Sequence, residues 1–291
     1  MIIVKLKGGL GNQMFQYAMG RMLAIKNNTS LKLDISEFEN KQILSHVTLR
    51  SYDLSHFNIV EEIATKEEIY AIAKISNNII SKIINKVKPT KYKCFVAEKK
   101  YGYDSRYLDI SRNTYIDGYW QSTKYIDSIR DILRNEFTLR EPLCGLYKDI
   151  ANKITSTNSV SLHIRRGDYV SNKVNSQIYN VCDPGYYSSA MEYINKKVSN
   201  PQYFVFSDDP EWVKENIKTR DMFIVDENSI NYIDLYLMSL CKHNIIANSS
   251  FSWWGGWLNS FKEKIVIAPE VWFKKPSYNI KDLMPSSWIK L

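Results

Sequence analysis

The sequence predicts an α/β protein built on parallel sheets of the doubly wound type. Short β-branched or aromatic runs alternate with helical stretches, and each run ends at a polar residue, a glycine or a proline. The first run, IIVKL (2–6), leads through a glycine-rich turn into a helix predicted over 14–26. The other predicted strands are SLKLD (30–34), SVSLHI (159–164), QYFVFS (202–207), MFIVD (222–226), NIIAN (244–248) and KIVIAP (264–269).

These strands form two groups, one near the N-terminus and one after about residue 158, with a less regular, helix-rich middle between them. A chain of 291 residues is long enough to bury two cores. EPLCG and TSTNS look like connectors near 140–158. We therefore expect an N-terminal domain over 1–150, with a helical insertion at about 60–95, and a C-terminal domain over 151–291.

The composition limits which classes of partner and site are plausible for this protein. A net charge of +8 indicates an anionic partner, which could be a nucleotide, a nucleic acid or an acidic membrane. The lysines are dispersed and no RNA-binding motif is visible, which disfavours a nucleic-acid binder. The four cysteines form no CxxC pair, so we expect four buried thiols rather than a metal site or disulfides. The absence of a leader and of a long apolar run predicts a cytoplasmic protein.

The segment 67–93 combines isoleucines at helical spacing with many lysines. A basic amphipathic helix of this kind can lie on an anionic membrane surface, which would make the contact peripheral. The alternative is a surface helix whose isoleucines pack on the domain. The sequence leaves both interpretations open.

The turn GGLGNQ (8–13) follows the first strand and opens a helix. Such a turn directs unpaired backbone N–H groups and the positive helix end toward a ligand. Gly9, Gly11 and Asn12 are its candidate binding residues. For Asn12, an amide donor that lines the site is the interpretation, and a local turn or cap role is the alternative.

The same turn partly fits a dinucleotide fingerprint, which would make the protein a nucleotide-binding oxidoreductase. Gly9 and Gly11 fit that pattern, and Asp34 stands at roughly the ribose-binding distance. Met14, however, occupies the position of the third glycine. The oxidoreductase remains the alternative hypothesis.

HIRRGDYV (163–170) ends a predicted strand with charged residues. His163 and Arg165 share one face of that strand, and ligands of doubly wound sheets bind at the carboxyl ends of strands. Arg165 is the candidate for an anion, because a guanidinium matches phosphate oxygens in a two-bond geometry. Its alternative is an internal ion pair. Arg166 is expected to face Asp168 or the other domain.

The pair Asp208 and Asp209 invites a metal hypothesis, but an aspartate before Pro210 is typical of a helix N-cap. Asp234, on an otherwise apolar helix, needs a partner, and the N1–H and amine of guanine would suit it. Hydroxyls open the next helix and could take a phosphate: Ser249, Ser250 and Ser252, after Asn248. We expect the tryptophans that follow to anchor that helix in the core rather than stack on sugar: Trp253, Trp254 and Trp257.

Together these segments resemble the alpha-1,2-fucosyltransferases of glycosyltransferase family 11. The matching pieces are GGLGNQMFQYA, HIRRGDYV, FSDD with the aspartate helix after it, and NSSFSWWGGWLN followed by IVIAPEVWF, in order from residue 8 to residue 273. HIRRGD is also similar to the His-x-Arg-Arg-x-Asp motif of alpha-1,6- and protein O-fucosyltransferases. The resemblance implies a GT-B architecture, with two Rossmann-like domains whose parallel sheets face a central cleft.

The resemblance also implies an activity: inverting transfer of L-fucose from GDP-L-fucose to the 2-hydroxyl of a β-galactoside, with no cofactor and no metal ion. The acceptor would be an oligosaccharide or a lipid-linked glycan of O-antigen type at the inner membrane face. Another nucleotide sugar is the alternative donor.

Roles carry over to matching positions only. By the resemblance, Arg165 holds the β-phosphate, His163 approaches the nucleoside and Asp234 contacts guanine. The 249–252 turn completes the diphosphate cradle, and Asn12 faces the fucose and diphosphate from across the cleft.

Asp168 is the candidate base for the acceptor hydroxyl, and orienting Arg165 or Arg166 is its alternative role. Tyr169 stands where the alpha-1,6 enzymes have a lysine, so base assignments from those enzymes do not transfer.

Overall fold

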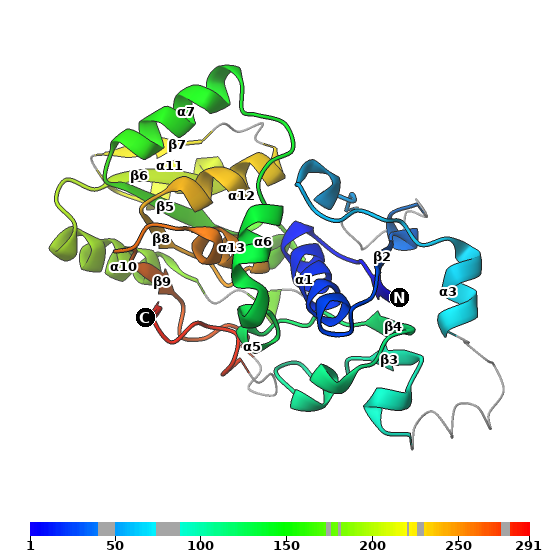
Figure 1. Ribbon diagram of the computed structural model, residues 1–291. Helices are drawn as coiled ribbons and strands as arrows, with labels where there is room; N and C mark the ends of the chain where they lie inside the picture. The colour runs from blue at the N-terminus through cyan, green and yellow to red at the C-terminus, as the bar shows by residue number, and fades with distance from the viewer. Residues whose placement is uncertain are drawn as a thin grey trace. The chain divides into compact units, whose positions relative to one another are not determined.

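The computed structural model describes residues 1–39, 50–73, 88–172, 176–179, 182–219, 221–225, 230–274 and 280–291, without the side chains of residues 168 and 171. It divides into two compact units: Met1–Thr138 with Tyr278–Met284, and Leu139–Ser277 with Pro285–Leu291. Each unit is built on one sheet whose paired strands are all parallel (Figure 1). The predicted α/β class with parallel sheets is confirmed.

Unit 1 contains a four-stranded sheet in the order β2-β1-β4-β3. Its strands are β1 (Ile2–Lys5), β2 (Leu31–Asp34), β3 (Phe95–Ala97) and β4 (Thr114–Asp117). Its helices are α1 (Leu10–Lys26), α2 (Ser36–Glu39), α3 (Lys66–Ala73), α5 (Thr123–Ile126) and α6 (Arg130–Glu136), with 3₁₀ turns η1 (Leu54–His56), η2 (Thr90–Tyr92), η3 (Ser105–Asp109) and η4 (Asp127–Ile129). The sequence predicted no strand for β3 or β4, because each has at most four residues and no clear alternation.

Helix α1 begins at Leu10, four residues before the predicted start. Gly8 has a φ of +76° and ends β1 in a tight turn, so that Gly9 is already the N-cap. Most of α1 is buried on all sides, which explains why its sequence lacks a polar face.

Unit 2 contains a six-stranded sheet in the order β10-β9-β8-β5-β6-β7. Its strands are β5 (Ser159–Ile164), β6 (Gln202–Ser207), β7 (Met222–Ile224), β8 (His243–Ile245), β9 (Val266–Ala268) and β10 (Ile289–Lys290). Its helices are α7 (Gly145–Ser156), α8 (Gly167–Ser171), α10 (Pro184–Lys197), α11 (Pro210–Asn216), α12 (Asn231–Leu240) and α13 (Ser250–Leu258). The predicted bounds of β5 and β6 are confirmed.

The two faces of β5 differ in chemistry. Val160, Leu162 and Ile164 belong to the core that α10 and α11 cover. On the opposite face, Ser161 bonds Asn244, and the His163 ring lies 5.5 Å from the ring of Phe251 in α13. The α13 tryptophans are buried, at 0% to 3% exposure, which confirms their core role: Trp253, Trp254 and Trp257.

The boundary between the units lies at Thr138, not at the predicted residue 150, which falls inside α7. The C-terminal domain also does not hold the whole of 151–291, because 278–284 belongs to unit 1. There the Asp282 carbonyl accepts from the Thr123 N–H at 3.0 Å and from the Ser122 hydroxyl at 3.0 Å. The Asp282 carboxylate also pairs with Lys124 at 2.7 Å.

Of the four cysteines, only Cys241 is buried, and Cys144 is exposed, so the expectation of four buried thiols was wrong. All four are free. Within the expected helical segment 67–93, α3 ends at Ala73, and residues 74–87 lie outside the described part of the chain. Among the described helices, none has the length and apolar character needed to cross a bilayer.

Candidate functional site

The carboxyl end of β5 places Arg165 beside Asp208. Ile164 pairs with Ser207 in the parallel register of β5 and β6, so the next residue on each strand falls side by side. The Arg165 guanidinium contacts the Asp208 carboxylate at 2.8 Å, and the two side chains are 23% and 26% exposed. The structure therefore shows the ion pair that was the alternative for Arg165, in a position that solvent still reaches. A phosphate contact by Arg165 stays a prediction.

Asp208 also fixes the loop after β5. Its second oxygen accepts the Arg166 backbone N–H at 2.8 Å. A Cβ placed on Gly167 would lie 2.5 Å from Asp208 Oδ2, so this position accommodates only glycine while the carboxylate holds Arg165. From the sequence alone, Asp208 suggested only a metal ligand, and this role in the loop was not predicted. The FSDD segment offered one signal, an acidic residue directly after a strand that neighbours β5.

Arg166 pairs with Asp209. Its Nε lies 3.0 Å from Asp209 Oδ2, and its guanidinium lies 4.2 Å from the ring centroid of Trp212. Asp209 accepts the Trp212 N–H at 3.2 Å and caps α11, which confirms the cap prediction. The Asp168 side chain lies outside the described part, so its role as a base stays a prediction.

His163 is buried beside this loop. Burial, and then the positive charge of Arg165, lower the pKa of His163 to about 3, so its imidazole is neutral at pH 7. Its Nδ1 is buried and forms no hydrogen bond with any residue that the structure describes. A neutral imidazole with an unused nitrogen can accept or donate one hydrogen bond to an uncharged part of a ligand.

Helix α12 follows β7 and helix α13 follows β8 in the chain, so both helices begin toward the carboxyl ends of the parallel strands. Asp234 lies in the first turn of α12 and is buried. Ser249 caps α13 by accepting the Phe251 N–H at 3.3 Å, and Ser250 is the first helical residue. The structure thus places the predicted residues of unit 2 toward the carboxyl ends of the strands. Ser252 differs from the others because it is fully buried. The Ser252 hydroxyl bonds Ala247 O at 3.3 Å, so a direct ligand contact would require it to leave this turn.

Asn248 braces the turn before α13, a role that sequence analysis did not assign. Its Nδ2 donates to the carbonyls of Tyr179 at 2.7 Å and Trp272 at 3.0 Å. The Tyr169 hydroxyl bonds the Asn248 carbonyl at 3.3 Å, so the segment after β5 is tied to the turn after β8. Tyr169, which stands where the alpha-1,6 enzymes have a lysine, is a structural link.

In unit 1, Gly8 is the glycine that the turn requires. Besides its positive φ, a Cβ on Gly8 would lie 2.9 Å from the Asn12 amide nitrogen. A Cβ on Gly9 would meet nothing closer than Arg50 Nε at 3.9 Å, and Gly11 is buried. Gln13 locks the turn by donating to Gly8 O at 3.0 Å. Whether Gly9 and Gly11 approach a ligand stays a prediction.

Asn12 is held by the turn after β4. Gln121 Nε2 donates to Asn12 Oδ1 at 2.7 Å. The Glu98 carboxylate accepts the N–H groups of Tyr119 at 2.7 Å and Trp120 at 3.2 Å, and burial raises the pKa of Glu98. Trp120 has a φ of +55°, so these bonds support a backbone conformation that is unfavourable for tryptophan.

Two features of unit 1 argue against the dinucleotide-binding hypothesis. Asp34 is buried, and its carboxylate accepts the Tyr115 hydroxyl at 2.6 Å and the Ser36 N–H at 3.0 Å, so it is committed within the unit. Met14 is fully buried where a third glycine would be needed. Among described residues, no group of three or more histidine, cysteine, aspartate and glutamate side chains is placed to hold a metal ion.

Comparison with known proteins identifies relatives over the whole chain. The sequence model of the family described as Glycosyl transferase family 11 matches residues 1–291. An alpha-1,2-colitosyltransferase of Escherichia coli is 35% identical, covering 100% of this chain and 98% of that protein. The E. coli O-antigen biosynthesis glycosyltransferase WbnK is 36% identical, over 98% and 99%. A crystal structure of the alpha-1,6-fucosyltransferase NodZ, soaked with GDP-fucose, aligns with a TM-score of 0.49 and 14% identity, over 88% and 91%.

Proposed function

Because the chain belongs to glycosyl transferase family 11, we propose that it transfers L-fucose from GDP-L-fucose to the 2-hydroxyl of a β-galactoside acceptor, with inversion at the anomeric carbon and without a metal ion. The observation that carries the proposal is the end of β5, where a guanidinium held by a carboxylate adjoins a neutral, buried imidazole. The glycosyltransferase E. coli relatives support the reaction class, and WbnK supports a surface-glycan acceptor.

The proposed chemistry follows from where charge appears. Breaking the sugar–phosphate bond leaves negative charge on the departing diphosphate. The fixed Arg165 guanidinium and the N–H groups at the start of α13 would stabilise that charge, which lowers the barrier. His163 would contact the nucleoside as a neutral group, and the Asp234 carboxylate would accept the N1–H and amine of guanine. Asp168 is the proposed base, and Gly9, Gly11 and Asn12 complete the proposed donor contacts.

Colitose is the second candidate for the transferred sugar, because the colitosyltransferase relative covers the entire chain. Colitose is L-fucose without its 3-hydroxyl, so the two donors differ in one polar group. A site that hydrogen-bonds that hydroxyl rejects the deoxy sugar by about 10⁴-fold or more. An apolar contact there rejects the hydroxylated sugar by only about 10²-fold.

Donor hydrolysis and transfer with a panel of nucleotide sugars test the donor. We expect kcat/KM with GDP-L-fucose to exceed that with GDP-colitose by about 10⁴-fold. A preference for GDP-colitose would move the assignment to the second candidate. Activity with a UDP-sugar and none with either GDP-sugar would refute the proposal.

Two arginine variants test whether Arg165 stabilises the departing diphosphate. Arg165→Ala should lower kcat by about 10²- to 10³-fold, because one preorganised donor to the leaving group is lost. Arg166→Ala is the matched control, since Arg166 is engaged by Asp209 and Trp212. It should change kcat by less than about tenfold. Equal losses in both variants would contradict the assignment of Arg165.

A further inference from the structure

A cavity of about 730 Å³ lies in unit 1, against β3, and has no part in the proposed transfer. It is lined by the residues of η2, β3 and η3 and their neighbours; we call it the lysine pocket: Lys88, Pro89, Thr90, Lys91, Lys93, Phe95, Val96, Ala97, Lys99, Asp104, Arg106, Tyr107 and Asp109. β3 is the edge strand of its sheet, and β4 separates it from β1. β3 therefore lies about 10 Å from β1, given the spacing of strands.

The lining carries five basic and two acidic side chains, for a net charge of +3. Of the two acids, Asp104 is already engaged by Arg106, through Nη2 at 2.6 Å and Nε at 2.9 Å. Lys88, Lys93 and Lys99 form no ammonium hydrogen bond or ion pair with any residue in the described ranges. The positive charge of the pocket is thus largely uncompensated.

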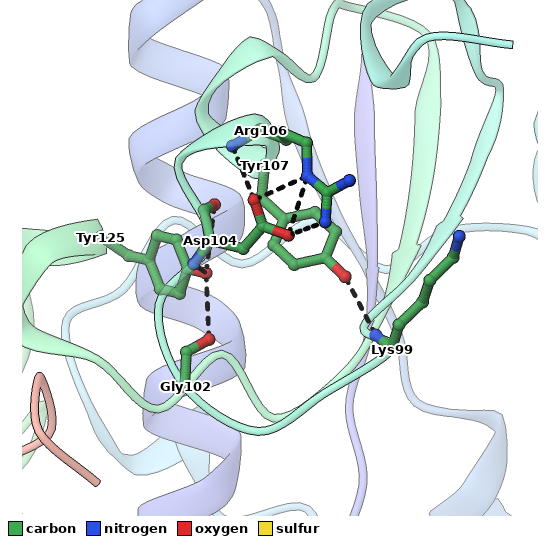
Figure 2. A network of polar contacts seen from close by, with 6 residues as sticks. All are labelled: Lys99, Gly102, Asp104, Arg106, Tyr107 and Tyr125. Atoms are coloured by element: carbon green, nitrogen blue, oxygen red, sulfur yellow. Dashed lines mark hydrogen bonds and ion pairs between the residues drawn. The ribbon is translucent and has the colours of Figure 1, made fainter. Parts of the chain in front are cut away.

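Hydrogen bonds preorganise the wall that carries these charges. Figure 2 shows that Asp104 ties the start of η3 to Arg106, and that its backbone N–H donates to the Tyr125 hydroxyl at 2.7 Å. The Lys99 backbone N–H donates to the Tyr107 hydroxyl at 2.9 Å, whereas the Lys99 ammonium contacts none of the other residues drawn in Figure 2. The wall is fixed, and the lysine ammonium remains available.

Lys93 lies close enough to Lys99 and Arg106 for their charges to affect its ammonium. It is partly buried, and burial together with the charges of Lys99 and Arg106 lowers the pKa of its ammonium. On an ordinary solvated surface, lysines diverge and keep their hydration. Here an ammonium loses water and faces like charges, which is unfavourable unless an anion completes the site.

We propose that the lysine pocket binds a phosphate-class anion, a phosphate monoester or a diphosphate. Several lysines that line one cavity suit an anion with more than one charge and oxygens in several directions. The volume lies within the range of small-ligand sites, which run from about 300 to 1,000 Å³. The phosphate could belong to a soluble ligand or to a lipid headgroup, and both would use the same lysines. The proposal does not depend on the donor sugar or on the transfer reaction.

Calorimetric titration with inorganic pyrophosphate tests the site. Arg165→Ala serves as the parent protein, so that anion binding at the end of β5 does not contribute. Lys99→Ala and Lys100→Ala form a matched pair, because they remove the same charge from neighbouring exposed positions and only Lys99 lines the pocket. We expect Lys99→Ala to weaken binding about tenfold or more and Lys100→Ala to weaken it less than about threefold. Equal weakening, or no binding to the parent, would overturn the proposal.

Lys93→Ala provides a second test that separates binding from folding. Without anion, its thermal midpoint should equal or exceed that of the parent, since the ammonium is desolvated there; with pyrophosphate, its midpoint should rise less than that of the parent. A lower midpoint without anion would assign Lys93 a structural role and overturn the proposal.

Co-sedimentation with vesicles shows whether the phosphate belongs to a lipid headgroup or to a soluble ligand. Phosphatidylglycerol vesicles carry the anionic headgroup, and phosphatidylcholine vesicles are the control. Selective sedimentation that Lys99→Ala abolishes supports a headgroup, and pyrophosphate binding without sedimentation supports a soluble ligand.

Discussion

Substitutions of Gly167 and Asp208 should be coupled in their effect on the free energy of unfolding, because the glycine leaves room for the carboxylate that holds Arg165. In Gly167→Ala, the new Cβ would lie 2.5 Å from Asp208 Oδ2 and 3.2 Å from its Cγ. The carboxylate must move by about 1 Å to reach ordinary contact distance. Both of its 2.8 Å contacts, to the Arg165 guanidinium and to the Arg166 N–H, would then be lost or weakened.

The size of the effect follows from these two contacts. A partly exposed ion pair contributes about 1 kcal/mol, and a hydrogen bond to a charged group about 1.5 kcal/mol. We therefore expect Gly167→Ala and Asp208→Ala each to lower the free energy of unfolding by about 2 kcal/mol. If the effects were independent, the double variant would lose about 4 kcal/mol. Because no carboxylate remains to be displaced, we expect it to lose only about 2 kcal/mol or slightly less, since alanine suits a helix start better than glycine.

Urea unfolding of the four proteins measures this coupling. The tryptophans of α13 belong to the same unit, so their fluorescence reports on the relevant part of the chain. Equal slopes against urea concentration are required for the comparison. Losses that add to within about 0.5 kcal/mol would refute the steric link between Gly167 and Asp208. All three variants should also lower the rate of transfer, because Arg165 loses its orienting partner.

Three further outcomes are expected. Gly8→Ala should lower the unfolding free energy by about 1 to 3 kcal/mol because its φ is +76°, whereas Gly9→Ala, with a φ of −75°, should stay within about 0.5 kcal/mol; equal losses would contradict this account of the turn. His163 has a folded pKa of about 3, below its usual 6.5, so the unfolded chain binds its proton first and stability falls as pH drops below about 6.5. His163→Gln should therefore remove about 1 kcal/mol of the stability lost between pH 6.5 and 5.5, and an unchanged pH profile would contradict the burial of a neutral ring. Excess EDTA should leave the rate of transfer within about twofold of its untreated value, and a loss above about tenfold would show that a metal ion participates.

Local patterns in the sequence were sufficient to predict several helices and strands. The bounds of β5 and β6 could be predicted because each has six residues of strongly strand-forming character, with a polar stop. The N-cap at Asp209 could be predicted because proline follows it directly. In each case the information lies within a few consecutive residues.

Short strands and domain limits depend on partners that a local pattern does not contain. β3 has three residues and becomes a strand only by pairing with β4. The segment 278–284 joins unit 1 through Asp282, whose contacts lie 159 and 160 positions away in the chain. The linker near residue 140 can be recognised in the sequence, but no local pattern indicates that 278–284 returns to unit 1.

For the same reason, the kind of site can be predicted from the local sequence, whereas the orientation of its side chains cannot. An arginine at the end of a central strand predicts an anion site at that sheet edge, because the strand fixes where the residue lies. Its guanidinium contacts Asp208, and that contact depends on the register that pairs Ile164 with Ser207. Likewise, Asn12 could be singled out as an amide in a turn, but its hydrogen bond comes from Gln121, 109 positions later. Residue type and strand position predict which groups reach a site, whereas the register between distant strands decides how those groups are held.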